Sequence, residues 1–214
     1  MKVSVIGLGY VGLPLACAIA KQTNHEVVGY DQSDSKISKI NQRICPIDDF
    51  QCEEDLKIVN LKCSTNPDII ANSDIYIVCV PTPVLNDYTP DLTPVKSATE
   101  IIAQFMKVGQ SVIIESTINP GVCDEIVIPI LEDITKLKAG IDFDVAHCPE
   151  RINPGDAVWN VYNIPRNIGS TSIAATKRLA DFYREFVDND INEMPNLKTA
   201  EATKIIENTF RDIN

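Results

Sequence analysis

The sequence has no long hydrophobic run, and it has too few basic residues to balance its acidic ones. No apolar stretch approaches the roughly eighteen residues of a membrane-spanning helix, so we expect no membrane partner. Lysine and arginine number 19 against 30 aspartates and glutamates, a formal net charge of −11. Because a protein of this charge repels polyanions, nucleic acid is disfavoured as a partner.

Cysteine is present, but no two cysteines form a CxxC pair. The seven cysteines are an odd number, and Cys17, Cys63 and Cys79 fall within expected helix or strand, as small buried residues do. We therefore expect free thiols, a reducing cytoplasmic location and no metal site. Cys45 and Cys52 flank a loop, and a disulfide between them is expected only as an incidental oxidation product.

A glycine-rich turn, Gly7-Leu-Gly-Tyr-Val-Gly12, lies between a predicted strand at residues 2–6 and a helical pattern at 11–21. In such a turn the first glycine permits the tight bend, the second lets the backbone approach a pyrophosphate, and the third lets the helix pack closely on the sheet. The helix N-terminus offers N–H groups and a positive dipole end to phosphates. The residues predicted to bind a dinucleotide here are Gly7, Gly9, Tyr10, Val11 and Gly12.

A second predicted strand, residues 26–30, leads into Asp31, nineteen residues after Gly12. An acidic residue at this spacing accepts hydrogen bonds from both hydroxyls of an adenosine ribose. Its carboxylate would repel a 2′-phosphate, so we predict NAD rather than NADP.

Two alternatives for the N-terminal segment with the glycine-rich turn are a ligand-free turn and a signal peptide. The second is disfavoured because the glycines and Pro14 interrupt the apolar run.

Strands and helices alternate along the rest of the chain. Helices are expected at residues 33–42, 53–58, 93–106, 119–133 (starting at Asn119-Pro120), 172–186 and 197–214. Strands are expected at residues 61–64, 75–80, 111–115, 143–147 and 190–194, with 149–165 mostly loop. This order predicts an α/β fold with a doubly wound, mostly parallel Rossmann-like sheet. We expect an NAD-binding domain at 1–195 and the start of a long connecting helix at 196–214.

Polar and turn residues follow several predicted strands, where ligands bind in doubly wound folds. They include the segments 80–83, 115–117 and 148–151. On the final helix, Lys204 and Asn208 are four residues apart and share one face, opposite an apolar face. The plain alternative is that the loops are simply polar and that Lys204 and Asn208 are solvated surface residues.

These motifs, in order, resemble the UDP-glucose/UDP-mannuronate dehydrogenase family across the whole chain. The motifs are the glycine-rich turn, Val80-Pro-Thr-Pro83, Glu115-Ser-Thr117, Pro149-Glu150-Arg151 and Lys204-x-x-x-Asn208. The segments 149–155 and 207–214 resemble most the branch that acts on UDP-N-acetylhexosamines. The resemblance implies a two-step oxidation of the sugar C6 hydroxyl by two NAD to a UDP-uronic acid, a reaction of polysaccharide biosynthesis.

The resemblance also implies roles for single residues. Lys204 and Asn208 would stabilise an oxyanion at C6. Thr117 would position a water molecule, and Glu150 would assist proton transfer or hydrolysis. Thr82 and Pro83 would border the cofactor, and Glu115 would lie near its nicotinamide end.

The sequence departs from the family at the nucleophile, a cysteine in a Gly-Gly-x-Cys-x-Pro motif that is absent here. Cys148 lies in the Glu150 motif, and we interpret it as an ordinary thiol. We therefore expect the cofactor-binding part of a longer enzyme, inactive alone and, at full length, a homodimer or higher homo-oligomer. Two alternatives remain. One is a β-hydroxyacid dehydrogenase, which also has a Lys-x-x-x-Asn helix. The other is a non-catalytic NAD-binding module.

Overall fold

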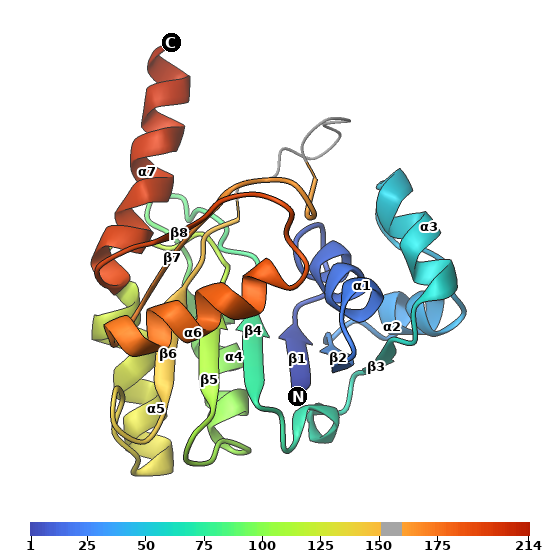
Figure 1. The fold of residues 1–214 in the computed structure, drawn as a ribbon, viewed down its shortest axis with the longest axis horizontal. Coiled ribbons are helices and arrows are strands. Elements are labelled where there is room, and N and C mark those ends of the chain that lie inside the picture. The colour runs from blue at the N-terminus through green and yellow to red at the C-terminus, as the bar shows by residue number, and fades with distance from the viewer. Residues whose placement is uncertain (151–159) are drawn as a thin grey trace.

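The computed structural model describes residues 1–150 and 160–214, and in this part of the chain one eight-stranded sheet lies between layers of helices (Figure 1). The strands are β1 (Lys2–Ile6), β2 (Glu26–Tyr30), β3 (Lys62–Ser64), β4 (Ile75–Val78), β5 (Ser111–Ile114), β6 (Asp144–His147), β7 (Arg166–Ser170) and β8 (Ile191–Glu193). The helices are α1 (Gly12–Gln22), α2 (Asp34–Asn41), α3 (Phe50–Ile58), α4 (Thr93–Ala103), α5 (Ile128–Thr135), α6 (Ile173–Arg184) and α7 (Leu197–Ile213), with a 3₁₀ helix at Pro67–Ile70 and a π-helix at Cys123–Val127.

The strand order is β3-β2-β1-β4-β5-β6-β7-β8, and every neighbouring pair is parallel except β6 and β7. The chain moves outward from β1 to β3 and then returns to place β4 on the other side of β1. This reversal creates a switch point between β1 and β4, where ligands bind in doubly wound sheets. The predicted α/β fold class is confirmed.

The sheet is buried on both faces. On one face Val5 and Ile113 pack with residues of α1, α3 and α6, and on the other face Val78, Val112 and Ile114 pack with residues of α4 and α5. All four residues of β4 and of β5 are buried. Burial on both faces explains why these strands are continuous apolar runs in the sequence rather than alternating ones.

The strand β7 was not among the predicted strands. Its sequence, Arg-Asn-Ile-Gly-Ser, holds three polar residues that normally lie at a surface, yet all five residues are buried. It pairs antiparallel to β6, with Ala146 opposite Ser170 and His147 opposite Gly169. The sheet therefore reverses direction once, and the reversal brings the start of β7 to the end of β6.

The helix expected to start at Asn119-Pro120 begins later. Gly121 has φ +99°, a left-handed conformation that breaks the helix, and the first helical element after it is the π-helix that begins at Cys123. The carboxylate of Glu201, on the distant helix α7, accepts hydrogen bonds from the N–H of Gly121 at 2.5 Å and of Cys123 at 2.9 Å. A tertiary contact thus defines the start of this helix.

Two other helix boundaries also differ from the prediction. Helix α3 begins at Phe50 rather than residue 53, because the Asp49 carboxylate accepts a hydrogen bond from the N–H of Cys52 at 2.8 Å and caps the first turn. Helix α4 ends at Ala103 rather than Met106. In the described part of the chain, no helix has both the length and the apolar character needed to cross a membrane.

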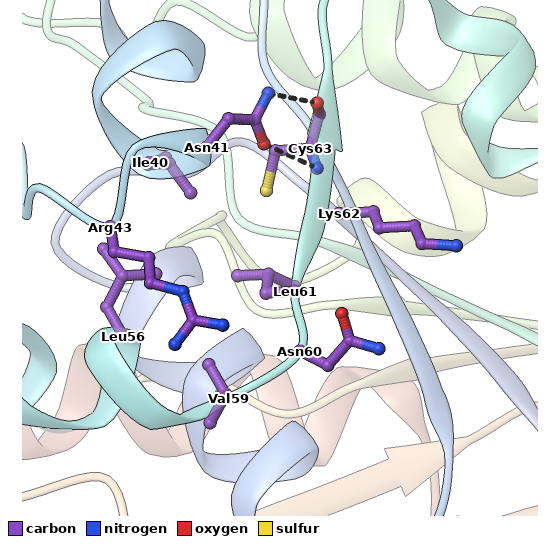
Figure 2. Close-up of a pocket in the computed structure, with 9 residues that line it drawn as sticks. All are labelled: Ile40, Asn41, Arg43, Leu56, Val59, Asn60, Leu61, Lys62 and Cys63. Atoms are coloured by element: carbon purple, nitrogen blue, oxygen red, sulfur yellow. Dashed lines mark hydrogen bonds between the residues drawn. The ribbon is translucent and has the colours of Figure 1, made fainter.

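One edge of the sheet, β3, is protected by a side chain (Figure 2). The Asn41 carboxamide donates to the carbonyl of Cys63 at 3.0 Å and accepts from its N–H at 3.3 Å, as a further strand would. Both groups lie on a cavity of about 400 Å³ between α2, α3 and β3. Satisfying the exposed strand in this way limits its pairing with another chain.

Candidate functional site

The three glycines of the turn between β1 and α1 meet different surroundings. Gly7 has φ +90°, and a Cβ there would lie 2.7 Å from the Cys79 carbonyl oxygen. A Cβ on Gly12 would lie 1.9 Å from the carbonyl oxygen of Gly7, whereas a Cβ on Gly9 would meet nothing within 4 Å. Gly7 and Gly12 are therefore required by the fold itself. At Gly9 the backbone faces open space, as it must for a phosphate group to approach.

A cavity of about 410 Å³ lies beside this turn, at the switch point between β1 and β4. It is lined by Ile6, Gly7, Tyr30, Asp31, Gln32, Lys36, Val80, Pro81, Thr93, Pro94, Ser97, Ala98 and Ile101. Thr82, which is half-buried, and Pro83, which is exposed, directly follow Pro81 in the chain, and Tyr10 is exposed. None of these three residues lines the cavity. The wall of the cavity from α4 is mixed, with Pro94, Ala98 and Ile101 apolar and Thr93 and Ser97 polar. The wall from the segment after β2 is polar.

Asp31 supplies the negative charge of this cavity. Its carboxylate accepts hydrogen bonds from the N–H of Leu8 at 2.8 Å and of Ser33 at 3.0 Å, and from Lys36 Nζ at 2.6 Å. Burial acts to raise the pKa of Asp31, but the Lys36 and backbone hydrogen bonds together hold it below its usual value. The carboxylate is therefore ionised at neutral pH. With three of about four acceptor positions used, it retains capacity for a ligand hydroxyl.

Lys36 was not predicted as a site residue. It lies in the first turn of α2, where the Ser33 side chain caps the helix, and it lines the cavity beside Asp31. The only signal for it in the sequence is its position five residues after Asp31. The ammonium of Lys36 therefore contacts the Asp31 carboxylate, the group that would bind a ribose.

Two of the other motifs, those of Lys204 and Glu150, are in contact just past the carboxyl end of β6. Lys204 is half-buried, and its Nζ donates a hydrogen bond to the backbone carbonyl of Glu150, 54 residues away in sequence. Asn208, one turn further along α7, is also half-buried, while Thr117 is exposed just past the end of β5. The N–H of Glu150 lies 3.5 Å from the carbonyl oxygen of Glu115, which links the β5 and β6 ends. Lys204 is therefore partly withdrawn from solvent and bonded to the protein, and its role in the site stays a prediction.

The first turns of α7 are held firmly against the sheet, which determines where Lys204 lies. The Asn196 side chain accepts from the N–H of Thr199 at 2.9 Å and caps the helix. Gly169 of β7 passes so close that a Cβ there would lie 2.3 Å from the Asn196 carbonyl oxygen. Glu201 is fully buried and bonds the π-helix as described above. Lys204 is less than one turn beyond Glu201, and so faces the end of β6.

Glu115 is fully buried and ion-paired. Arg166 Nη1 donates to one carboxylate oxygen at 2.9 Å, and the Tyr183 hydroxyl donates to the other. Burial raises the pKa of Glu115, as does the nearby charge of Glu150, while Arg166 opposes the rise. Arg166 was missed by the sequence analysis because β7 was missed. The expected contact of Glu115 with a nicotinamide stays a prediction.

Cys148 is fully buried beside this pair, and burial together with the charge of Glu115 raises the pKa of its thiol to about 12. A protonated, inaccessible thiol is a poor nucleophile, in agreement with its interpretation as an ordinary thiol. All seven cysteines are free. Arg151 and the rest of residues 151–159, expected to be loop, lie outside the described residues.

Comparison with known proteins agrees with this geometry. Residues 1–187 match the model of the NAD binding domain of the UDP-glucose/GDP-mannose dehydrogenase family. The chain is 37% identical over 214 residues to the UDP-N-acetyl-D-glucosamine 6-dehydrogenase of Pseudomonas aeruginosa, and covers 100% of itself and 50% of that protein. It is 39% identical over 218 residues to the UDP-N-acetyl-D-mannosamine dehydrogenase of Pyrococcus horikoshii, with 100% and 51% covered.

Solved structures show the same relationship. The UDP-D-ManNAc dehydrogenase of Pyrococcus horikoshii superimposes with a TM-score of 0.94, covering 100% of this chain and 51% of that one. The GDP-mannose dehydrogenase of Pseudomonas aeruginosa, solved as a ternary complex, has a TM-score of 0.90 at 29% identity, with 100% and 50% covered. The chain thus spans about half the length of the relatives it matches.

Proposed function

Because this chain belongs to the UDP-glucose/GDP-mannose dehydrogenase family through its NAD-binding domain, we propose that it serves the NAD-dependent oxidation of a UDP-N-acetylhexosamine. The C6 hydroxyl of the sugar would become a carboxylate, giving a UDP-uronic acid. The observation that carries this proposal is the hydrogen bond from Lys204 to the Glu150 carbonyl. It brings together two motifs at the edge of the sheet that also holds the dinucleotide turn.

The described residues fit NAD. Gly9 leaves room for a pyrophosphate at the N-terminus of α1, and Asp31 keeps an acceptor position for a ribose hydroxyl. The apolar side chains of Ala98 and Ile101 on α4 suit an adenine ring. Tyr10, Val11, Thr82, Pro83 and Glu115 would border the cofactor further along. Bound NAD would supply the hydride acceptor for the C6 carbon.

The side chains at the end of β6 match the needs of alcohol oxidation. As a primary alcohol loses a hydride, its proton must be removed and the developing charge on oxygen must be held. Lys204 and Asn208 would hold that oxygen, in a half-buried position where hydrogen bonds act more strongly than in water. Glu150 would take part in proton transfer, and Thr117 would orient the water needed for the second oxidation.

We also propose that this domain works within a longer polypeptide, which would bind the UDP part and supply the nucleophilic cysteine. The apolar face of the last half of α7 is open in the described structure: Ile206 is 65%, Phe210 69% and Ile213 79% exposed. This part of α7 projects beyond the sheet (Figure 1). It suits the start, at residues 196–214, of a connecting helix that packs in a homodimer or higher homo-oligomer.

The free thiols favour the cytoplasm as the location of this protein.

The exchange Asp31→Asn is expected to weaken NAD binding about tenfold while raising the affinity for NADP relative to NAD. Asparagine keeps an oxygen for the N–H of Leu8 but loses the charge that opposes a 2′-phosphate, and it frees Lys36 to meet that phosphate. Titration calorimetry of the isolated chain with both cofactors measures this. The wild-type chain should prefer NAD; equal affinities for the two would count against the assigned ribose contact.

The proposed function is tested by comparing this chain with the longer polypeptide in an assay of NADH formation. We expect the chain alone to bind NAD without oxidising any sugar nucleotide. We expect the longer protein to oxidise UDP-GlcNAc or UDP-ManNAc in preference to UDP-glucose, with two NADH formed per sugar. Oxidation of a small β-hydroxyacid instead would favour the related dehydrogenase class. NAD binding with no turnover of any substrate by the longer protein would favour a non-catalytic module.

A further inference from the structure

A buried ion pair lies next to Glu150. Arg166 is 1% exposed and Glu115 is fully buried, and the two side chains meet at 2.9 Å. The Tyr183 hydroxyl also bonds Glu115, and its ring centre lies 5.5 Å from the guanidinium carbon of Arg166. A buried ion pair seldom stabilises a fold more than apolar residues of the same size would. Its presence therefore calls for a reason other than stability.

The Glu115 pairing uses only part of the Arg166 guanidinium. Nη2 of Arg166 lies 3.6 Å from Oε2 of Glu150, within ion-pair distance. Neither Nη2 nor Nε has a hydrogen-bond partner among the described residues. Contacts of this length in ligand-free enzymes often shorten when substrate binds. Arg166 is thus placed to bridge two carboxylates, those of Glu115 and Glu150.

The reversal of the sheet at β7 explains this placement. In the antiparallel pairing Ala146 faces Ser170 and His147 faces Gly169, and the same register continued beyond the ladder sets Glu150 opposite Arg166. A parallel β7 would start at the other end of the sheet, far from Glu150. The antiparallel strand therefore brings a cation to the carboxyl edge at the point where β6 ends.

We propose that Arg166 is a positioning residue for the oxidation, holding the Glu150 carboxylate in place while Glu115 and Tyr183 hold Arg166. This rests on the proposed function, since it gives Glu150 a part in proton transfer. Lys204 bonds the backbone carbonyl of the same residue, so Glu150 is fixed at two points from two elements, β7 and α7. Arg166 acts through Glu150 and need not touch the sugar.

The substitution Arg166→Lys, in the longer dehydrogenase, tests the proposal. Lysine keeps a positive charge beside Glu115, but its donors all lie on one nitrogen, whereas Arg166 reaches Glu115 and Glu150 from two separate nitrogens in a fixed planar fork. Lysine therefore cannot reproduce the geometry in which the guanidinium holds Glu150. We expect kcat for the UDP-N-acetylhexosamine to fall about 10- to 100-fold, as misplacement of a catalytic group by about 1 Å does. The KM for NAD should stay within about twofold. The double substitution Glu115→Gln/Arg166→Gln removes both charges of the buried pair, so neither Glu115 nor Arg166 leaves the other unpaired. It serves as the second variant if the lysine variant folds poorly, and it should lower kcat to the same extent.

A double-mutant cycle separates positioning from general damage. In a Glu150→Gln background, Arg166→Lys should lower kcat less than about twofold further, because the carboxylate that it positions is gone. Arg178→Lys is the matched control: Arg178 pairs with Asp144 at 2.8 Å at the other end of β6, and this variant should retain full kcat.

The outcomes are distinguishable. Unchanged kcat in Arg166→Lys, or an equal fall with and without Glu150, would overturn the positioning role while leaving the proposed function in place. Unchanged kcat in Glu150→Gln alone would instead contradict the role that the proposed function assigns to Glu150.

Discussion

Replacing Gly9 with valine is expected to abolish measurable NAD binding, a loss of at least about 100-fold in affinity, while the domain stays folded. A Cβ at this position would meet nothing within 4 Å apart from its chain neighbours, so we expect valine to fit without displacing the turn. It does fill the space through which a pyrophosphate would approach the backbone at the N-terminus of α1. A loss of 100-fold corresponds to about 2.7 kcal/mol, the order of one or two charge-assisted hydrogen bonds.

Calorimetry with NAD and thermal unfolding of the same preparations measure the two effects separately. The matched variant is Gly12→Ala, where the new Cβ would lie 1.9 Å from the carbonyl oxygen of Gly7 and force the helix away from the turn. We expect it to lower the unfolding midpoint strongly, and Gly9→Val to leave the midpoint nearly unchanged. A folded Gly9→Val protein with normal NAD affinity would contradict the assignment of the turn as the pyrophosphate site.

The second large effect is expected from Lys204→Met, which should lower kcat of the longer dehydrogenase by on the order of 10²–10³. The substitution removes the amine from the position where a C6 oxyanion is to be held, and methionine keeps the length and the apolar stem of the side chain. In the ligand-free protein it removes one hydrogen bond to the Glu150 carbonyl, worth about 1 kcal/mol of stability. NAD affinity should not change, because the cofactor cavity is lined by other elements.

Lys198→Met is the control for this variant. Lys198 lies on the same helix, its side chain is 61% exposed, and its ion pair with Asp124 is long, at 3.8 Å. We expect full activity from it, with an unfolding midpoint close to that of wild type. Retention of kcat by Lys204→Met would remove the charge-stabilising role from Lys204, and an equal loss in Lys198→Met would indicate a defect of α7 as a whole.

Local patterns predicted the parts of the fold in which local and tertiary preferences agree. The apolar runs of β4 and β5, the glycine-rich turn and the acidic residue after β2 each follow a spacing that the chain must have to form a βαβ unit, and each lies where predicted. The strand β7 was not predicted, because its polar residues can be buried only where residues distant in sequence pair with them. Arg166, for example, is neutralised by Glu115, 51 residues away.

The candidate site divides in the same way. Local spacing predicted Gly9 and Asp31 as candidate residues, because a turn, a helix start and a strand end are formed by residues close in sequence. Arg166 could not be found from spacing, since its relation to Glu150 depends on the direction of one strand. Lys204 was identified by a resemblance, but its contact with Glu150 depends on Glu201, which sets the position of α7 by bonding the N–H groups of Gly121 and Cys123.

The sequence by itself thus determined that this protein has a doubly wound sheet with a dinucleotide turn, because glycine, apolar and acidic residues at short spacing dictate those elements locally. The tertiary structure alone decided that β7 is antiparallel to β6, and that Lys204, Glu150 and Arg166 meet at one edge of the sheet. Those contacts join residues tens of positions apart in the sequence. They form in the folded protein because a charged group withdrawn from water costs free energy unless it is paired.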